Sequence, residues 1–392
     1  MPLPKPHITK NSFFHEVPSS ESDPSSPYPT TIYFISGNPG LISYYHVFLS
    51  LLGGKLTELV APGESGRRNA FHVVGHSLAG FELEPGNGIG GAKGNGKVEG
   101  PEHYSDVKEQ IHFVLRRLDY RMRALCEASC SEKRSSQKPK VILIGHSVGT
   151  YMGMEIIRRH RERQAQAQGQ TRASEDKGEG AGVDFDIIGG IMLFPTVMDI
   201  ADSPSGRKLT FLLRLIPQLA LVASLFVRLL TTLLPESFIR ALIRAVMRSP
   251  PEEAVDATAS FLKSRRGVRQ ALHMATDEMR VISRDKWDDE VWGISAPAHS
   301  EQDKQQQTTN NLAMYFYFGR NDHWVAERTR EDIIALRGSP KAKSGSESGD
   351  GNENVTRPKM FVCEESVPHA FCLRHNETMA GKVANMIKEI LA

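Results

Sequence analysis

The sequence predicts an α/β protein whose mostly parallel central sheet is flanked by helices. Six apolar runs have the length of strands and are nearly continuous, which is typical of strands buried on both faces of a sheet. They span residues 31–37, 71–77, 141–147, 187–195, 314–319 and 359–365. Segments with apolar residues at helical spacing lie between or after these runs, at residues 43–60, 104–126, 148–163, 324–337 and 375–391. This alternation favours strands that are connected by helices.

The composition narrows the class of protein. The chain has 392 residues, of which 40% are hydrophobic and 24% charged, so it is long enough for one large core with insertions. Its formal net charge of +2 provides no field that would attract nucleic acid. The 14 histidines include no HExxH pair, and no Walker loop or dinucleotide fingerprint follows a strand. We therefore expect no nucleic-acid partner, no metal and no cofactor.

One region interrupts the alternation and predicts an inserted cap. Over a hundred residues separate the strand that ends near Pro195 from the strand that starts near Met314, far more than in a usual βα connection. We therefore assign residues 1–198 and 312–392 to the two parts of one core, and residues 199–311 to a helical cap. Tracts rich in polar residues, Gly or Pro predict surface insertions at residues 17–30, 84–101, 128–140, 160–182 and 338–358.

The cap contains an apolar segment, residues 209–248, that allows two interpretations. Its longest uncharged stretch lies between Arg214 and Arg228 and is too short to cross a bilayer, which takes about 20 residues. The segment can lie in the plane of a lipid interface, or it can pack the cap onto the sheet. Both interpretations hold if one face is buried and another is exposed to lipid.

The motif with the most specific chemistry is G-x-S-x-G, formed by Gly145, Ser147 and Gly149 between a predicted strand and a predicted helix. A nucleophile at such a sharp turn has a strained backbone, and side chains two residues away would collide. This nucleophile elbow, in which His146 precedes the serine, is typical of the α/β-hydrolase fold. The helix behind it directs free N–H groups at a developing oxyanion, and we expect Val148 to supply one of them.

A second serine at a strand end, Ser77 in VVGHSLAG, is an alternative nucleophile. Its fifth motif position is Ala79, glycine comes only at Gly80, and a Gly-rich tract rather than a helix follows. We therefore expect Ser77 to line the rim of the sheet and Ser147 to be the nucleophile.

A catalytic serine needs a base and an acid, and in this fold the acid and then the histidine follow it along the chain, each on a loop after a strand. Asp322 follows the run MYFYFG, and His369 follows the run KMFVCEE. These two residues therefore complete a Ser-His-Asp triad with Ser147. The alternatives for the two roles are Asp199, Asp202, His323 and His375.

The loop after the first predicted strand, ISGNPGLISYY, is expected to supply the second oxyanion donor. Gly37 and Gly40 let its backbone approach a substrate, whereas Pro39 has no N–H group. Asn38 is then the candidate donor. Asn-Pro-Gly is also common in plain turns, so the assignment depends on the place of this loop in the fold.

These motifs resemble the lipid droplet-associated hydrolase family, a branch of the α/β-hydrolases. The similarity includes FISGNPGLISYYHVFLSLL, GHSVGTYM, FPTVMDIADSPSGRKLT, FGRNDHWV and VPHAF, and it extends from residue 31 to residue 391. The resemblance implies an α/β-hydrolase fold, a triad of Ser147, Asp322 and His369, and a location at the surface of lipid droplets. It also implies a role in the storage or turnover of neutral lipid.

Two functions follow from the sequence. The first is that of a serine carboxylic ester hydrolase, similar to an esterase or lipase, that cleaves lipid esters such as sterol esters or acylglycerols through an acyl-enzyme. The alternative is a lipid droplet surface protein that binds lipid with little or no catalytic activity. Epoxide or haloalkane hydrolysis is disfavoured, because relatives with those activities need a carboxylate where this elbow has Ser147.

The expected location is the cytosolic face of the lipid droplet, with the endoplasmic reticulum as a second site. The N-terminus MPLPKPHITKNSFF has no apolar run of signal-peptide length. The cysteines, Cys126, Cys130, Cys363 and Cys372, have neither zinc-finger nor CxxC spacing, which favours a reducing compartment. The expected partners are the lipid ester substrate and the droplet monolayer, which the cap contacts.

Overall fold

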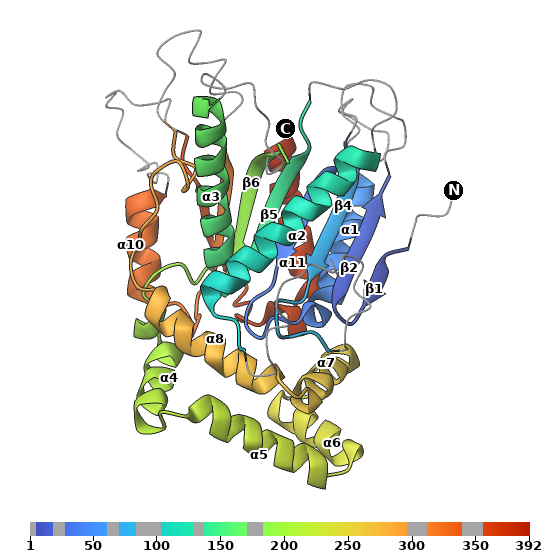
Figure 1. Cartoon of the computed structure of the whole chain (residues 1–392), viewed down its shortest axis with the longest axis vertical. Helices are drawn as coiled ribbons and strands as arrows, with labels where there is room; N and C mark the ends of the chain where they lie inside the picture. The colour runs from blue at the N-terminus through green and yellow to red at the C-terminus, as the bar shows by residue number, and fades with distance from the viewer. Residues whose placement is uncertain are drawn as a thin grey trace.

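The computed structural model describes residues 5–18, 28–60, 70–83, 103–128, 137–170, 183–295, 312–338 and 356–392. In this part of the chain an 8-stranded sheet has the order β1-β2-β4-β3-β5-β6-β7-β8 (Figure 1). The predicted strands are all present, as β3 (Thr30–Ile35), β4 (Phe71–His76), β5 (Lys140–His146), β6 (Asp186–Leu193), β7 (Ala313–Phe318) and β8 (Lys359–Val362). They pair parallel to one another, which confirms the predicted α/β fold.

Two strands at the start of the chain have no counterpart in the prediction. β1 (His7–Thr9) and β2 (Ser12–Val17) pair antiparallel, and β2 is also antiparallel to β4. In β2 the side chains of Phe13 and Val17 are buried, whereas Glu16 is exposed. A search for nearly continuous apolar runs misses such a strand, because only alternate residues of β2 are buried.

Helices cover both faces of the sheet. α2 (Val107–Ala128), α3 (Val148–Gln170) and α10 (Glu327–Arg337) pack on one face, and α1 (His46–Val60) and α11 (Asn376–Leu391) pack on the other (Figure 1). Alternate residues of β5 enter the two cores, since Val141 and Leu143 belong to the first and Ile142 and Ile144 to the second. The runs that form β3 to β7 are therefore strands with two buried faces, as predicted. The prediction is wrong for β8, which lies at the edge of the sheet and has no buried residue.

The prediction that residues 160–182 form a surface insertion is wrong for residues 160–170, which continue α3. The sequence there, HRERQAQAQGQ, consists mostly of good helix formers, and its polar character had indicated a loop. His160 is buried, and Nε2 lies 2.9 Å from the carbonyl oxygen of Phe185. Residues 171–182 lie outside the described residues, as do residues 19–27, 84–101, 129–136, 296–311 and 339–355 of the other predicted insertions and of the cap.

The cap follows β6 and consists of short helices. They are η2 (Ile200–Asp202), α4 (Pro204–Leu215), α5 (Leu219–Leu233), α6 (Glu236–Val246), α7 (Glu252–Lys263) and α8 (Gly267–Val281). Figure 1 shows α4, α5 and α6 farthest from the sheet, with α7 and α8 between them and the core. Two backbone hydrogen bonds close the neck of the cap, from Asp199 N–H to Ser283 at 3.0 Å and from Ile200 N–H to Ile282 at 3.2 Å.

The apolar segment 209–248 thus runs through α4, α5 and α6 rather than through one long helix. Among the described residues, no single helix is long and apolar enough to cross a membrane. Within the described ranges, α4 and α5 are the one pair of helices that together have that length and composition, and they are bent by 92° where they meet.

The segment after α8 packs with the core, although it lies within the range we assigned to the cap. Trp287, Val291 and Trp292 are buried in the cluster under α2 and α3. The ring of Trp292 stacks on Phe316 of β7, with ring centroids 5.1 Å apart. The described cap helices therefore end with α8.

Candidate active site

The strand-to-helix turn at Ser147 has a geometry that few residues permit. β5 ends at His146 and α3 begins at Val148, so Ser147 makes the turn with a φ of 54°, a strain of about 1–3 kcal/mol. A Cβ atom on Gly145 would lie 2.6 Å from the carbonyl oxygen of Gly149. A Cβ atom on Gly149 would lie 2.3 Å from the carbonyl oxygen of Ile35 in β3. This turn therefore requires both glycines of the motif.

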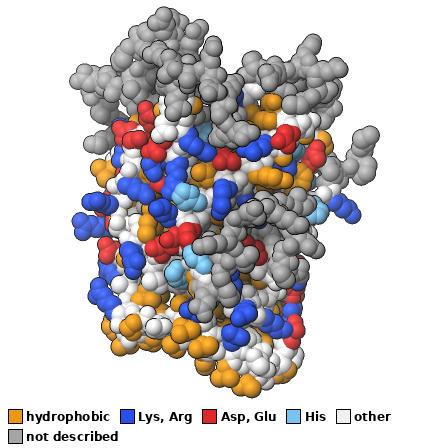
Figure 2. Space-filling view, in the orientation of Figure 1, with side chains coloured by type: hydrophobic (Ala, Val, Ile, Leu, Met, Phe, Trp, Pro, Cys, Tyr) orange, Lys and Arg blue, Asp and Glu red, His pale blue; other side chains and the backbone are white. Residues whose placement is uncertain are grey.

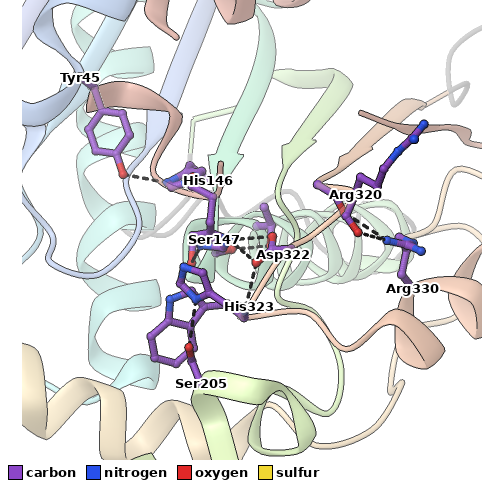
Figure 3. Close-up of polar contacts among 12 residues, drawn as sticks. Tyr45, His146, Ser147, Ser205, Arg320, Asp322, His323 and Arg330 are labelled. Carbon is purple, nitrogen blue, oxygen red and sulfur yellow. Dashed lines mark hydrogen bonds and ion pairs between the residues drawn. The ribbon is translucent and has the colours of Figure 1, made fainter. Parts of the chain in front are cut away.

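The structure brings Ser147, His369 and Asp322 together from three loops after strands, and Figure 3 labels two of them, Ser147 and Asp322. Nε2 of His369 lies 2.9 Å from the Ser147 hydroxyl. Nδ1 of His369 lies 2.7 Å and 2.9 Å from the two carboxylate oxygens of Asp322. An ionised carboxylate only accepts hydrogen bonds, so Nδ1 carries the proton and Nε2 presents its lone pair to Ser147. This is the tautomer that a general base needs.

Asp322 is buried but is held in its charged form. Burial alone would raise the pKa of its carboxyl group, but the hydrogen bond and charge of His369 lower this pKa below its ordinary value. The N–H of Trp324, 2.8 Å from Oδ1, contributes in the same direction. Asp322 can therefore stabilise a positive charge on His369 when it forms.

His146 connects the elbow to the loop that contains His369. Burial, followed by the nearby His369, lowers the pKa of His146 to about 3, so its ring is neutral. Its Nε2–H donates to the carbonyl oxygen of His369 at 2.9 Å, since a carbonyl can only accept. Nδ1 then accepts from the hydroxyl of Tyr45 at 2.8 Å (Figure 3). The backbone of His369 is thus held by a second histidine, His146, whose ring nitrogens bond to His369 and Tyr45 rather than to the Ser147 hydroxyl.

The loop between β3 and η1 (Ile42–Tyr45) lies directly against the serine. A Cβ atom on Gly37 would lie 2.9 Å from Cβ of Ser147, so only glycine permits this approach. Asn38 follows, and its N–H makes no hydrogen bond to any other described residue. Val148 is the first residue of α3, where N–H groups have no partner within the helix. Both predicted oxyanion donors therefore belong to segments that flank Ser147.

The alternative nucleophile and acids have other positions. The Ser77 hydroxyl accepts the N–H of Ile42 at 3.2 Å and so stabilises the start of η1. Asp199 and Asp202 lie at the neck of the cap, where Asp202 N–H donates to the carbonyl oxygen of Asp199 at 3.0 Å. The carboxylate bonded to His369 is that of Asp322.

The alternative histidines also make other contacts. Nδ1 of His323 lies 3.0 Å from the Ser205 hydroxyl at the start of α4, and the His323 carbonyl oxygen accepts the Ser205 N–H at 2.9 Å (Figure 3). His323 therefore connects the acid loop to the cap. His375 precedes α11, where its carbonyl oxygen accepts the N–H of Met379 at 3.1 Å. His369 is the histidine within hydrogen-bond distance of Ser147.

Further side chains hold the loops of the site, and few features of the sequence indicate them. Tyr45 lies in the expected oxyanion loop, where a pair of tyrosines was the one available signal. Arg330 of α10 donates to the carbonyl oxygens of Gly319 at 3.3 Å and Arg320 at 2.7 Å, just before Asp322 (Figure 3). Arg330 and the buried Glu278 of α8 occur in amphipathic helices among many other charged residues, so no pattern distinguishes them.

The arrangement brings together a serine hydroxyl, an imidazole, a carboxylate and two N–H groups that have no partner among the described residues. A set of this kind can carry out acyl transfer. Among the described residues, no group of three or more His, Cys, Asp or Glu side chains is placed to hold a metal ion.

Known proteins are similar to this chain over most of its length. Residues 28–372 match the family described as lipid-droplet associated hydrolase. The lipid droplet-associated hydrolase of Gallus gallus is 24% identical over 375 residues, which cover 94% of this chain and 88% of the relative. The protein of the same name from Homo sapiens is 23% identical over 364 residues, which cover 92% of this chain and 85% of the relative.

Solved structures with a similar chain trace have low sequence identity. The haloalkane dehalogenase DbeA from Bradyrhizobium elkani is 12% identical, with a TM-score of 0.48, and the match covers 98% of this chain and 96% of that chain. A carboxylesterase structure from Nitrososphaera gargenis is 10% identical, with a TM-score of 0.45 and coverage of 98% and 97%. The family match over residues 28–372 is consistent with the observed fold, a mostly parallel sheet with helices on both faces. The chain therefore belongs to the lipid-droplet associated hydrolase family and is a hydrolase of the α/β-hydrolase type.

Proposed function

We propose that this chain is a serine ester hydrolase that cleaves lipid esters through an acyl-enzyme. The observation that carries the proposal is the hydrogen-bonded series from Asp322 through His369 to Ser147, with Ser147 at a strained turn. A structural serine needs neither this strain nor a histidine whose lone pair is directed at its hydroxyl.

In the proposed reaction, Oγ of Ser147 attacks the ester carbonyl carbon while Nε2 of His369 takes the hydroxyl proton. The carbonyl oxygen becomes an oxyanion and accepts hydrogen bonds from the N–H groups of Asn38 and Val148. The bond to the alcohol then breaks, and the alcohol leaves with the proton from His369. Water, deprotonated by His369, then attacks the acyl group on Ser147. The bond between the acyl carbon and Oγ of Ser147 breaks, Oγ takes the proton back from His369, and a carboxylic acid is released. Each oxyanion donor is expected to contribute about 2.7–4 kcal/mol to the transition state.

The apolar surface of the cap supports a lipid substrate. Large hydrophobic side chains are exposed along α4, α5 and α6, and we call this surface the apolar cap face. It comprises Phe211, Leu212, Leu215, Val222, Leu225, Phe226, Leu229, Leu233, Phe238, Leu242 and Val246. Figure 2 shows hydrophobic side chains gathered along the lower edge of the molecule, where Figure 1 has these helices. Exposed apolar surface of this extent is typical of a membrane or partner contact.

The charged residues of α6 do not compete with this contact, because they bond to α7. Arg244 donates to Glu252 at 2.8 Å, and Arg240 donates to both Glu252 and Asp256. We therefore propose that the cap docks on the monolayer of a lipid droplet from the cytosolic side, with the endoplasmic reticulum as a second site. The substrate would be a sterol ester, an acylglycerol or a similar neutral lipid, taken from that surface.

Labelling of the purified chain with a fluorophosphonate probe tests the activated nucleophile. We expect the native chain and Ser77→Ala to be labelled and Ser147→Ala not to be labelled. Ser77 is a matched control, because it also ends a strand in a Gly-His-Ser sequence. Hydrolysis of emulsified cholesteryl oleate and triolein by the native chain, absent in Ser147→Ala, would then identify the ester class.

A second function, lipid binding without turnover, is favoured by the apolar cap face alone. It predicts that Ser147→Ala binds droplets as the native chain does and that the folded native chain is not labelled. Failure of the labelling, with binding intact, would replace the proposed hydrolase by this function.

A further inference from the structure

The side chain of Asn38 joins the oxyanion loop to helix α8 of the cap. Its Nδ2 group donates to the carbonyl oxygen of Ala271 at 2.9 Å and to Oε1 of Glu278, also at 2.9 Å. Ala271 and Glu278 are about two helical turns apart, so they lie on the same side of α8. Both hydrogens of one amide group are thus bonded to α8, which fixes the orientation of the Asn38 side chain.

Glu278 is an unusual partner for this amide, because it is 5% exposed and has no bonded cation among the described residues. Burial and then the neighbouring Asp277 raise the pKa of its carboxyl group to about 8, although the Asn38 hydrogen bond lowers it. Within the described chain, α2, α4, α5, α7 and η2 pack against α8, and none presents a charged group that shifts this pKa. Glu278 is therefore mostly uncharged at neutral pH, and its carbonyl oxygen accepts from Asn38.

The two ends of this contact have different surroundings. Asn38 directly follows Gly37, whose backbone lies against Ser147. By contrast, α8 packs against α5, which carries much of the apolar cap face. No other hydrogen bond of the Asn38 side chain reaches a described residue, and its Oδ1 is buried without a partner. The position of the Asn38 backbone N–H thus depends on α8.

We propose that Glu278 is a positioning residue, which holds the side chain of Asn38 so that the backbone N–H of Asn38 points at the oxyanion formed on Ser147. This inference rests on the proposed function, because it assigns Asn38 as an oxyanion donor. Glu278 does not touch the reacting atoms and acts through Asn38. The cap therefore contributes to the oxyanion site as well as to lipid contact.

The buried carboxyl group of Glu278 makes the proposed oxyanion site sensitive to pH. Below about pH 8 the buried carboxyl group is neutral and leaves the site without an added charge. Above this pH it ionises, and a negative charge beside an oxyanion donor opposes formation of the oxyanion. We therefore expect the rate of acylation to fall as the pH rises through about 8.

The test measures the rate constant of fluorophosphonate labelling of Ser147, and kcat and KM for p-nitrophenyl butyrate, between pH 6 and pH 10. Glu278→Leu removes the acceptor and is expected to slow labelling by about 10- to 100-fold and to lower kcat more than it changes KM. Glu278→Gln retains a carbonyl oxygen for Asn38, so we expect it to keep most of the labelling rate at pH 7 and to lose the decline above pH 8. Asp277→Asn is the control for the labelling rate at pH 6, because Asp277 accepts the N–H of Val107 at 3.0 Å and does not touch Asn38. Since the charge of Asp277 raises the pKa of Glu278, this variant should also move the alkaline decline to lower pH.

Equal labelling rates for Glu278→Leu and the native chain would overturn the inference, as would an unchanged alkaline decline in Glu278→Gln. If Glu278→Leu does not fold, as judged by circular dichroism, the pH profile of Glu278→Gln still tests the role of Glu278. A folded native chain that is not labelled at any pH would overturn the proposed function itself. If the native chain is labelled and the Glu278 variants have the labelling rates and pH profile of the native chain, only the role of Glu278 is overturned.

Discussion

The hydroxyl oxygen of Tyr45 lies 2.8 Å from Nδ1 of His146, and this pair joins three loops of the site. The same hydroxyl accepts the N–H of Gly37 at 3.3 Å, next to Asn38. The other nitrogen of His146 donates to the carbonyl oxygen of His369 at 2.9 Å. A single buried series of hydrogen bonds therefore sets the distance between the oxyanion loop, the elbow and the base.

Tyr45→Phe should lower both stability and turnover. The substitution leaves the buried Nδ1 of His146 and the N–H of Gly37 without a partner, which costs about 1–3 kcal/mol of unfolding free energy. We also expect kcat to fall by at least about tenfold, because a displacement of ~1 Å in the site can cost about a hundredfold in rate. Urea unfolding and hydrolysis of p-nitrophenyl butyrate measure the two effects.

Tyr44→Phe is the control for this prediction. Tyr44 is adjacent in the sequence, but its hydroxyl lies 2.8 Å from Oγ1 of Thr258 in α7. Its loss should change stability modestly and leave kcat close to that of the native chain. A larger loss of kcat in Tyr44→Phe than in Tyr45→Phe would contradict the assigned series.

Gly149→Ala should disrupt the elbow. The added Cβ atom would lie 2.3 Å from the carbonyl oxygen of Ile35, a backbone atom of the central sheet that cannot easily move. We expect a loss of about 1–3 kcal/mol in stability and loss of fluorophosphonate labelling at Ser147. Gly153→Ala, one turn later in α3, would meet the flexible end of Met192 at 3.3 Å and Cδ1 of Ile35 at 3.9 Å, so it should retain labelling. Thermal melts and labelling of both variants check the prediction. Full labelling of Gly149→Ala would contradict it.

Polar substitutions on the apolar cap face should weaken lipid binding without affecting the chemistry. Phe226, Leu229 and Leu233 lie on α5 and are more than half exposed. Changing the three to Gln should weaken binding to phospholipid-coated triolein droplets by about fivefold or more per residue, if each contributes about 1 kcal/mol. Turnover of a water-soluble ester should be retained. Flotation measures the binding.

Leu336→Gln is the matched control for the cap variants, because Leu336 is equally exposed but lies on α10. It should bind droplets as the native chain does. If both kinds of variant lost binding equally, the apolar cap face would not be the docking surface.

The sheet could be predicted from the sequence where its strands are buried on both faces. Alternate residues of β5 and β7 enter two cores, so each strand is a continuous apolar run. β2 could not be recognised in this way, because its buried residues, Phe13, His15 and Val17, alternate with residues that are partly or fully exposed. The end of α3 was also misplaced, because a polar surface helix and a polar loop have similar compositions.

The proposed catalytic residues have a local signal in the sequence, whereas the residues that we propose to position them do not. Ser147 lies between two glycines that the turn requires, and Asp322 and His369 each follow an apolar strand. Glu278 reaches Asn38 from a point 240 residues farther along the chain. Such a contact depends on how α8 packs on the core, and no spacing in the sequence encodes it.

The closed neck of the cap has a consequence for how the chain can change over evolution. Asp199 and Ser283 are joined by a backbone hydrogen bond of 3.0 Å, so the excursion between them leaves the core and returns to the same place. An insertion whose two ends meet demands no rearrangement of the strands on either side, and the entropy of closing it grows only slowly with its length. Caps of other lengths and surface chemistry can therefore be exchanged at this junction while the sheet, the elbow and the base loop are inherited unchanged.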